Sequence, residues 1–513
     1  MTLPTSWSDV APVPGSPGAV ELAVDAEDWL KVARAVAEST GQLIALWATA
    51  SDKTGKGGRV QAAFLVERRL LVSTLDMSDA KRSYAGLQGL FPAAARMQRA
   101  AFDLTGIRSD AEDQRPWLRH AAWDGEPPLR TDTIPPRSSA ASIDDYAFIR
   151  VEGDGVHEIP VGPVHAGIIE PGHFRFSIVG EKVLRLEERL GYVHKGIERR
   201  FTEMPLLDAH RLAARISGDS AVAFSWAYCQ AVEGLLCANV SSRASYLRAL
   251  ALELERLQNH LGDIGALGND AGFAFGLAQF SRLKEYLLRA VNQALGQRYL
   301  FDFVVPGGVW KDCDASGVSL LDRVTQEIAN EVQALRVIYD EHAGVRDRFV
   351  GAGQVSPELA RQLGLCGLAG RASGQALDLR VDCPWPPYGE VGVQKCVQSA
   401  GDVAARVAAR FDEVRESCAL IARILASLPS GALRVDVNAT RSSGFAVGLI
   451  EGWRGPVLIA LQVAAGGVIS RCHAHDPSWQ NWPVLEHAII GNIVPDFPLI
   501  NKSFNLSYSG HDL

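Results

Sequence analysis

Cysteine is the residue type with the widest chemical range in this chain, because a thiolate can bind soft metals, form disulfides or act as a nucleophile. The 513-residue sequence holds eight cysteines, and no two of them form a C-x-x-C pair. This spacing argues against a disulfide framework, a zinc site and an iron-sulfur cluster held by the chain itself. We therefore interpret them as small buried apolar side chains, at positions 229, 237, 313, 366, 383, 396, 418 and 472.

A second group with possible chemistry lies in the segment from Glu253 to Asp263. Glu253, Arg256 and His260 recur at intervals of three and four residues, which places them on one face of a helix. Such a charged stripe is more often a solvated or inter-helix network than a catalytic site. We expect a network of this kind here.

Charge and hydropathy exclude several classes of function. The net charge is -8, and no run of lysine and arginine follows a phosphate backbone, so nucleic acid is not an expected partner. The N-terminal segment lacks the basic start and apolar core of a signal peptide, which favours a cytoplasmic location. The most apolar window, residues 456–470, is shorter than the roughly 20 residues of a membrane span. Its composition predicts buried strands.

The elements that must position any site divide the chain into two folded parts. Residues 1–20 are rich in proline, glycine and serine and are predicted to be a mobile arm, and residues 21–125 are predicted to form an α+β domain. Its expected elements are an amphipathic helix, a hairpin around a turn-rich segment, a further strand and a second helix, over residues 27–37, 43–49 with 60–66, 70–74 and 93–104. A linker rich in proline, charge and serine follows at residues 126–150.

Residues 151–513 are predicted to form a larger, mainly helical domain with small β-sheets, which makes the whole chain α+β. A hairpin is expected where the alternating run 174–179 meets the segment after residue 182. Apolar residues at threes and fours predict four long helices, and two strands are predicted near the C-terminus. The helices cover residues 220–236, 245–261, 317–345 and 401–428, and the strands cover residues 433–437 and 456–461.

Ordered sequence blocks in the larger domain resemble the large subunits of group 4 membrane-bound nickel-iron hydrogenases and respiratory complex I, closest to the formate hydrogenlyase and hydrogenase-4 type. Upstream, residues 91–107, 117–119 and 128–132 resemble the small, 30-kDa-like complex I module, which is fused in such proteins, although its usual tryptophan-glutamate-arginine cluster is missing. The downstream blocks, in family order, are 162–176, 191–198 (GYVHKGIE), 252–267, 306–309, 378–385 and 477–500.

The resemblance shows what the chain has lost. The hydrogenase pattern R-x-C-G-x-C is readable as RISGDS, with Ser217 and Ser220 at the cysteine places, and the C-terminal pattern places Ser507 and Gly510 at the other two. A serine hydroxyl is a hard, neutral ligand and glycine has no side chain, whereas nickel and low-valent iron need soft thiolates. We therefore expect no nickel-iron centre and no cofactor in this chain. An oxygen-ligated metal at Asp219, His511 or Asp512 is a weaker alternative.

Two further positions of the hydrogenase site are retained. Glu170 resembles the glutamate that passes protons away from the metals, a role that an apolar pocket would favour by raising its pKa. Pairing of Glu170 with an arginine such as Arg175 is the structural alternative. Arg454 resembles the arginine above the open face of the metals, and without metals we favour a structural ion pair.

His165 and His173 stand where complex I relatives place histidines of the quinone-headgroup loop, and an imidazole there can donate a proton to a reduced quinone. The tyrosine that complex I uses as second headgroup partner corresponds to Gly218 in this chain. Half of the expected pair is therefore missing. We treat His165 and His173 as candidate quinone contacts, against the simpler interpretation of hydrogen-bonded loop histidines.

The resemblance implies a core subunit of a respiratory, membrane-associated oxidoreductase complex that itself is not a nickel-iron hydrogenase. Its partners would be a small subunit with an iron-sulfur cluster, antiporter-like membrane subunits and a formate dehydrogenase-type or other electron-input subunit. The chain would lie on the cytoplasmic side of the cell membrane and pass electrons to a quinone or another acceptor. The alternative is a redox-silent subunit that bridges the peripheral and membrane arms.

Overall fold

The N-terminal part is built on one mixed sheet in the order β1-β2-β5-β4-β3. The computed structural model describes residues 10–50, 58–77, 83–120, 127–130, 145–164, 169–438 and 443–513. Strand β2 runs parallel to β5, and β3 pairs antiparallel with β4, which confirms the predicted hairpin. The strands are β1 (Ala11–Pro12), β2 (Val20–Val24), β3 (Gln42–Ala50), β4 (Gly58–Val66) and β5 (Arg69–Met77).

Two helices pack on this sheet, α1 (Ala26–Glu38) and α2 (Ala94–Thr105). Both confirm the predicted positions. The α1 helix is capped by Asp25, whose carboxylate accepts hydrogen bonds from the backbone of the first turn, and it buries an apolar face spaced at threes and fours. The short strands β6 (Ser83–Tyr84) and β7 (Arg108–Ser109) pair beside α2.

Residues 10–20 correct the prediction of a mobile arm, because they pack against the larger domain. The Ser16 N–H donates to the Val447 carbonyl at 2.8 Å, and the Val447 N–H donates to Pro14 at 3.0 Å. Gly15 has φ 108°, and a Cβ atom there would lie 2.0 Å from the Val447 oxygen. Only glycine fits so close a backbone approach. Residues 1–9 lie outside the described part of the chain.

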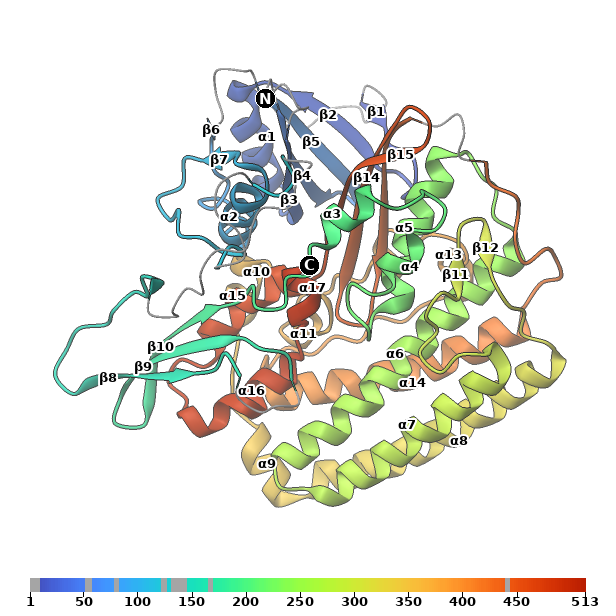
Figure 1. Cartoon of the computed structure of the whole chain (residues 1–513). Coiled ribbons are helices and arrows are strands. Elements are labelled where there is room, and N and C mark those ends of the chain that lie inside the picture. The colour runs from blue at the N-terminus through green and yellow to red at the C-terminus, as the bar shows by residue number, and fades with distance from the viewer. Residues whose placement is uncertain are drawn as a thin grey trace.

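The larger domain opens with a three-stranded antiparallel sheet that extends away from the body of the molecule (Figure 1). The predicted hairpin is confirmed as β9 (His173–Val179) and β10 (Lys182–Arg189), and β8 (Val156–Val161) adds a third strand on the β9 side. Helix α15 (Ser478–Ala488) packs against β10.

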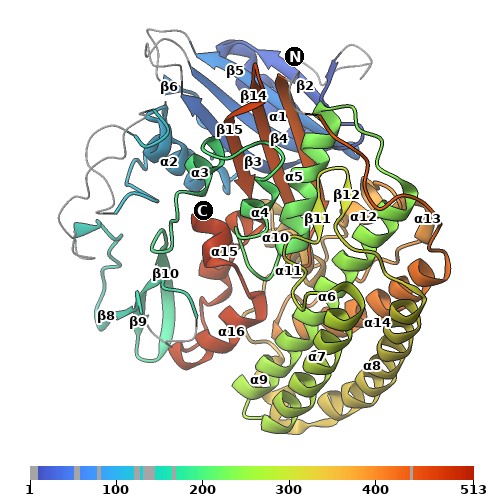
Figure 2. The ribbon, with the colours of Figure 1, turned by 45° about the vertical axis from the view of Figure 1, so that its right-hand side comes forward.

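Four long helices form the lower part of the molecule, and Figure 2 shows them running side by side. Each packs on its neighbours in the order α6-α7-α8-α14, and α14 returns to α6. Helices α6, α8 and α14 lie where helical periodicity predicts, although α6 begins earlier and ends later than its predicted range, whereas α7 is not among the four predicted helices. Their bounds are α6 (Ser242–Asp270), α7 (Ala274–Leu295), α8 (Ala315–Glu341) and α14 (Val403–Ala426).

A second antiparallel sheet, β13-β14-β15, lies between the bundle and the N-terminal sheet, with α5 (Ala221–Leu235) packed on β13 and β14. The predicted apolar window forms β14 and the start of β15. The predicted strand at residues 433–437 is wrong, because Arg434 makes only an isolated bridge to Gly308. The strands are β13 (Gly444–Glu451), β14 (Pro456–Ala464) and β15 (Val468–His475).

Among the described residues, no helix combines the length and apolar character that a membrane span requires.

Short elements connect these layers. The short elements are α3 (Ile197–Thr202), α4 (His210–Ala213), β11 (Val304–Val305), β12 (Gly308–Val309), α9 (Ala343–Phe349), α10 (Pro357–Leu363), α11 (Gly367–Ala372), α12 (Leu379–Asp382), α13 (Tyr388–Val391), a 3-10 turn (Val494–Asp496), α16 (Phe497–Phe504) and α17 (Tyr508–Asp512).

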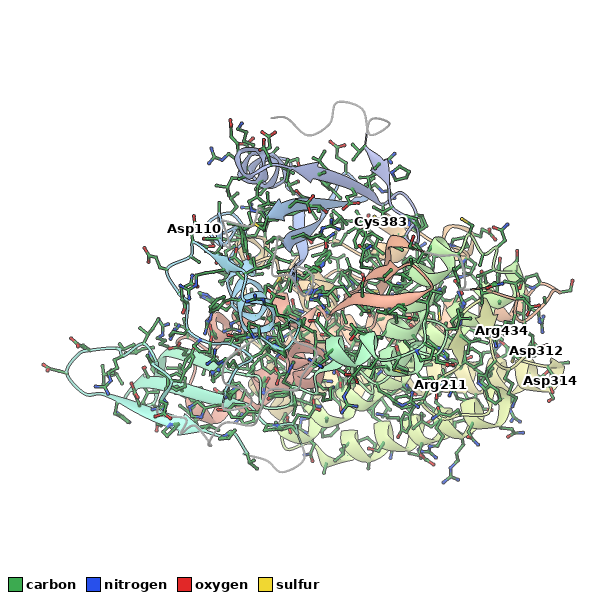
Figure 3. The ribbon with its side chains drawn as sticks, turned by 45° about the horizontal axis from the view of Figure 1, so that its top comes forward. Asp110, Arg211, Asp312, Asp314, Cys383 and Arg434 are labelled. Carbon is green, nitrogen blue, oxygen red and sulfur yellow. The ribbon has the colours of Figure 1, made fainter. Side chains whose placement is uncertain are left out.

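The two folded parts share a buried junction. The Trp47 ring of β3 stacks on His473 of β15 at 5.0 Å between ring centroids, and Arg471 Nε donates to the Ala48 carbonyl at 3.2 Å. A second contact lies near Cys383, labelled in Figure 3, whose Sγ is 3.0 Å from the Arg68 carbonyl oxygen. The sheet of the N-terminal part is therefore fixed to the β13-β15 sheet.

Candidate functional site

The four positions that the metal-ligand pattern leaves without cysteine are brought together by the fold. Ser217 and Ser220 lie directly before α5, and Ser507 and Gly510 lie at α17. Ser217 Oγ and Ser507 Oγ are 2.8 Å apart, and the Gly510 N–H donates to Ser507 Oγ at 2.8 Å. Residues 290 positions apart in sequence thus form one polar site.

Arg454 closes this site as one half of an ion pair. Its guanidinium holds Asp219 through two bonds, at 2.7 and 2.5 Å, and its Nε donates to the Asn505 carbonyl at 2.6 Å. Burial alone would raise the pKa of Asp219, but Arg454 holds that pKa below its usual value. Ser217 Oγ donates to the same carboxylate at 2.8 Å. The structure therefore places Arg454 in the ion-pair role.

Asp476, which sequence analysis missed, occupies space that a cysteine at position 510 would need. A Cβ atom on Gly510 would lie 2.6 Å from Asp476 Oδ2 and 2.9 Å from Ser507 Oγ. The other oxygen, Oδ1, accepts the Ser478 N–H at 2.8 Å, whereas Oδ2 has no hydrogen-bond partner among the described residues. Burial raises the pKa of Asp476. Its position directly before the 477–500 block was the available signal.

Direct contacts fill the interior of the site. Two hydroxyl oxygens at hydrogen-bond distance leave no space for an atom between Ser217 and Ser507. Within the described ranges, no three histidine, cysteine, aspartate or glutamate side chains are grouped so that they could hold a metal ion. His511 and Asp512, considered for an oxygen-ligated metal, bond to each other at 2.8 Å, and Asp512 also accepts the Val193 N–H. The residues present thus do not fit a nickel-iron centre.

Glu170 lies at the edge of this site and not in an apolar pocket. Its side chain is exposed, and its Oε2 accepts the Ser509 N–H at 3.0 Å. Arg175, the partner considered for it, binds Glu158 at 3.1 Å instead. The expected apolar surroundings and the expected pairing are both wrong, because the segment ends on the surface beside α17.

Of the two histidines proposed for a quinone loop, the described part of the chain contains only His173. His173 is fully buried in β9, with its Nδ1 3.2 Å from the Gly162 carbonyl and its Nε2 accepting from Arg175 Nε at 3.4 Å. Both ring nitrogens thus have protein partners. His165 lies outside the described residues.

The polar site reaches the surface at Gly218 and Asp219, and these two residues are termed its mouth. Gly218 is exposed, and a Cβ atom there would meet only Phe301, at 3.6 Å. The Asp219 side chain is 39% exposed, although its partner Arg454 is 6% exposed. A molecule at this surface can therefore reach Asp219 without entering the closed interior.

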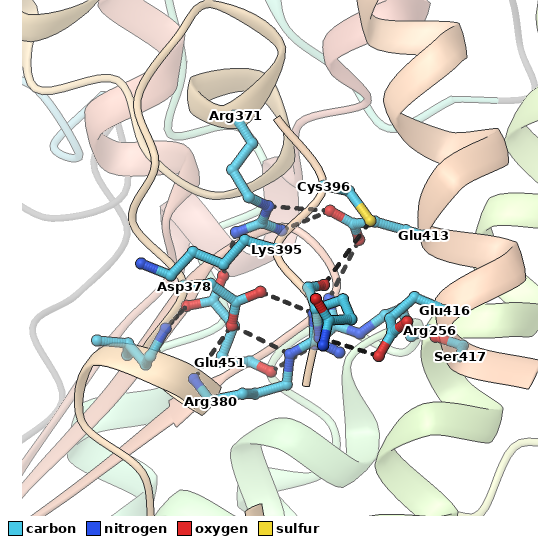
Figure 4. Close-up of polar contacts among 12 residues, drawn as sticks. Arg256, Arg371, Asp378, Arg380, Lys395, Cys396, Glu413, Glu416, Ser417 and Glu451 are labelled. Carbon is cyan, nitrogen blue, oxygen red and sulfur yellow. Dashed lines mark hydrogen bonds and ion pairs between the residues drawn. The ribbon is translucent and has the colours of Figure 1, made fainter. Parts of the chain in front are cut away.

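The charged stripe on α6 belongs to a buried inter-helix network, as predicted (Figure 4). His260 Nε2 lies 2.8 Å from Glu413 of α14, and Glu253 binds Arg380 of α12 at 3.0 Å. Arg256 donates to the carbonyls of Glu451 and Gly452, at 2.9 and 3.1 Å. The network thus contacts the segment that carries Arg454.

Two family models and several known proteins match this chain. The family model described as the 30 kDa subunit of respiratory-chain NADH dehydrogenase matches residues 22–138, and that of the 49 kDa subunit matches residues 270–443. Formate hydrogenlyase subunit 5 of Escherichia coli K12 is 32% identical, over 84% of this chain and 77% of the relative. Hydrogenase-4 component G of the same organism is 30% identical, with coverage of 84% and 76%.

The fold also has a counterpart among solved structures. A chain from the membrane-bound sulfane sulfur reductase, an archaeal respiratory membrane complex, superposes with a TM-score of 0.66 at 24% identity. The superposition covers 70% of this chain and 99% of that chain. At this identity, the likeness supports the fold alone.

Proposed function

Since this chain belongs to the family that joins formate hydrogenlyase subunit 5 and hydrogenase-4 component G with the 49 and 30 kDa subunits of respiratory-chain NADH dehydrogenase, we propose that it is a core subunit of a membrane-bound oxidoreductase complex without nickel-iron chemistry of its own. The observation that carries this proposal is the direct contact of Ser217 with Ser507 where cysteines would hold metals. Hydroxyls supply neither the charge nor the softness of thiolates.

The partners follow from the same proposal. A small subunit would carry the iron-sulfur cluster, antiporter-like subunits would form the membrane arm, and a formate dehydrogenase-type or other subunit would deliver electrons. This chain would then associate with the cytoplasmic face of the cell membrane through those partners.

Metal content tests the loss of the hydrogenase centre. The experiment is purification of the complex through a tag on this chain, followed by elemental analysis and an assay of hydrogen uptake. We expect iron from the partner cluster but no stoichiometric nickel, and no hydrogen uptake. One nickel per complex together with hydrogen uptake would refute the proposal.

Electron transfer to a quinone or another small acceptor is supported by the exposed mouth at Gly218 and Asp219. A polar group that stabilises a reduced acceptor must lie within reach of it, and the carboxylate of Asp219 with its Arg454 partner meets this requirement. The filled interior supports the alternative, a redox-silent subunit that bridges the two arms.

The variant Asp219→Asn separates these two functions because it changes the charge at the mouth with little change in shape. If an acceptor binds there, acceptor reduction by the whole complex should fall by about tenfold in kcat/KM, equivalent to about 1.4 kcal/mol. Asp302→Asn is the matched control, since Asp302 forms a surface ion pair with Arg215 nearby. Unchanged turnover in an assembled Asp219→Asn complex would instead support the alternative, a redox-silent subunit that bridges the two arms.

A further inference from the structure

A cluster of ionisable side chains is buried where α6, α11, α12, α14 and β13 meet (Figure 4). Each of its members is at most 2% exposed. Water therefore contributes little to the balance of charge within it, and each charge depends on its protein partners. The members are Glu253, Arg256, His260, Arg371, Asp378, Arg380, Glu413 and Glu451.

Arg371 and Arg380 are the two centres of this cluster. Arg371 binds Glu413 through Nε and Nη2, at 3.0 and 2.7 Å, and binds Glu451 through Nη1 at 2.8 Å. Arg380 binds Asp378 at 2.7 Å and Glu253 at 3.0 Å. Each guanidinium thus serves two carboxyl groups, which gives a continuous chain of opposite charges.

The cluster holds one more carboxyl group than guanidinium group. Four carboxyls face the three guanidiniums of Arg256, Arg371 and Arg380, and burial lowers the pKa of His260, which disfavours a further positive charge on that ring. Three pairs of charged groups at the edges are balanced within themselves, so they do not correct the imbalance, and the nearby Glu255 binds only backbone N–H groups. These pairs are Asp382 with Lys395, Glu416 with Arg423, and Asp263 with Arg410.

Glu451 is the least supported of the four carboxyls. Its Oε1 accepts one bond from Arg371, and its Oε2 accepts only the Leu379 N–H, at 3.3 Å. Glu253, in contrast, accepts bonds from Arg380 and from the Tyr388 and Ser417 hydroxyls, both at 2.8 Å. A proton shared among these carboxyls should therefore reside on Glu451, because the carboxylate form of Glu451 would accept the fewest hydrogen bonds of the four.

We propose that Glu451 is a proton-storage site, whose side chain is a neutral carboxylic acid in the resting protein and whose proton balances the charge of the buried cluster. Release of this proton to solvent leaves a carboxylate and a cluster with one net negative charge. Burial, with a contribution from Asp378, raises the pKa of Glu451 to about 7 against the pull of Arg371, so the proton can exchange near neutral pH.

The position of Glu451 relates this proton to the polar site described above. Glu451 ends β13 and lies three residues before Arg454, and Arg256 binds the backbone carbonyls of Glu451 and Gly452. The Trp453 indole donates to the Asp219 carbonyl at 2.8 Å. The inference depends on the cluster alone and holds whether or not electrons pass through the polar site.

Infrared difference spectroscopy of the full chain tests the proposal. The difference between the spectra of the wild type and Glu451→Gln should contain the carbonyl stretch of a protonated carboxylic acid at about pH 6, and this component should be lost by about pH 8, with a midpoint near the pKa of about 7. Taking the difference removes the signal of Glu255, whose raised pKa also keeps a proton on its carboxyl group in this range. The component of Glu451 should disappear from Glu451→Gln at every pH. It should persist in Glu416→Gln, the matched control from the edge of the cluster. The absence of this component from the difference spectrum at about pH 6 would overturn the proposal.

A comparison of two glutamine variants gives an independent readout. Glutamine matches a protonated Glu451, so Glu451→Gln should fold and keep its Tm at about pH 6. Glu413, which accepts bonds from Arg371 and His260, should be ionised, and Glu413→Gln should therefore lower the Tm. Between about pH 4.5 and about pH 7, the pKa values of Glu451 in the unfolded and folded protein, the wild type should lose Tm relative to Glu451→Gln, because only the folded state holds the proton over this range. Failure of Glu451→Gln to fold, or equal Tm losses in both variants, would also overturn the proposal.

Discussion

At the scale of single residues, the polar site formed by Ser217, Ser220, Ser507 and Gly510 is occupied by direct contacts between protein groups. Asp476 Oδ2 lies in the space beside Gly510, and Arg454 has Asp219 as its partner. A cysteine substituted for Gly510 would therefore meet the carboxylate of Asp476. The neutral hydroxyls of Ser217 and Ser507 complete each other's hydrogen bonding.

The variant Gly510→Ala measures how tightly this site is packed. Because its Cβ atom would lie 2.6 Å from Asp476 Oδ2, we expect a loss of about 1–3 kcal/mol in the free energy of unfolding, typical of overpacking. Chemical denaturation of the full chain gives the value. Gly89→Ala is the control, since a Cβ atom at Gly89 has open space around it. Equal stability of the two variants would show that Asp476 moves freely.

Sequence could predict the site only as far as motif positions define it. The vacant cysteine places and Arg454 could be identified because each matches a position of the hydrogenase pattern. Asp476 was missed because its role depends on contact with Gly510, which is distant in sequence. The surroundings of Glu170 were mistaken because no local pattern reports that its segment ends on the surface.

At the scale of elements, α5 shows how a distant side chain completes a helix end. No side chain within its own sequence caps this helix. Instead, Glu255 of α6 accepts the backbone N–H groups of Val222 and Ala223, at 2.7 and 3.2 Å. A carboxyl group at a helix N-terminus satisfies donors that the helix leaves open. The segment that carries Ser217 and Ser220 is held by this contact.

The variant Glu255→Gln should differ from the wild type in how its stability depends on pH. Burial raises the pKa of Glu255 from its usual 4.5 to about 8. The folded protein therefore binds a proton that the unfolded chain releases between these values, and the associated stability is lost as the pH rises through this range. The Tm of Glu255→Gln relative to wild type should therefore increase from about pH 5 to about pH 9. A pH-independent difference in thermal denaturation would contradict this assignment.

Periodicity predicted the long elements well, because an amphipathic helix such as α1 reports its buried face locally. It missed β8, where exposed residues flank a strand that exists only through pairing with β9. It also overestimated residues 433–437, whose Val and Leu content resembles a strand but which meet the short β12 strand only through the isolated bridge of Arg434 to Gly308.

At the scale of the whole molecule, the N-terminal part and the larger domain meet through buried charge as well as apolar packing. Glu198 of α3 binds Arg471 at 3.1 Å and His473 at 2.6 Å, and these two residues of β15 contact Ala48 and Trp47. The carboxylate therefore orients the side chains that hold the N-terminal sheet. Its loss should loosen the junction that joins the two folded parts.

Glu198→Gln tests this arrangement through its acid dependence. Arg471 and His473 lower the pKa of Glu198 to about 2 although burial opposes the shift, so its contribution exists above about pH 4.5 and is lost as the pH falls toward 2. At about pH 7, the free energy of unfolding of the variant should be about 3–5 kcal/mol lower than that of the wild type, because Arg471 keeps a buried charge without its partner. This difference is the deficit of the variant. Urea unfolding followed by tryptophan fluorescence measures this deficit. Glu27→Gln is the control, because it removes an exposed ion pair. Since the unfolded wild type takes up the proton first, the deficit should shrink below about pH 4. A deficit of constant size across this range would mean that Glu198 acts through shape and not through charge.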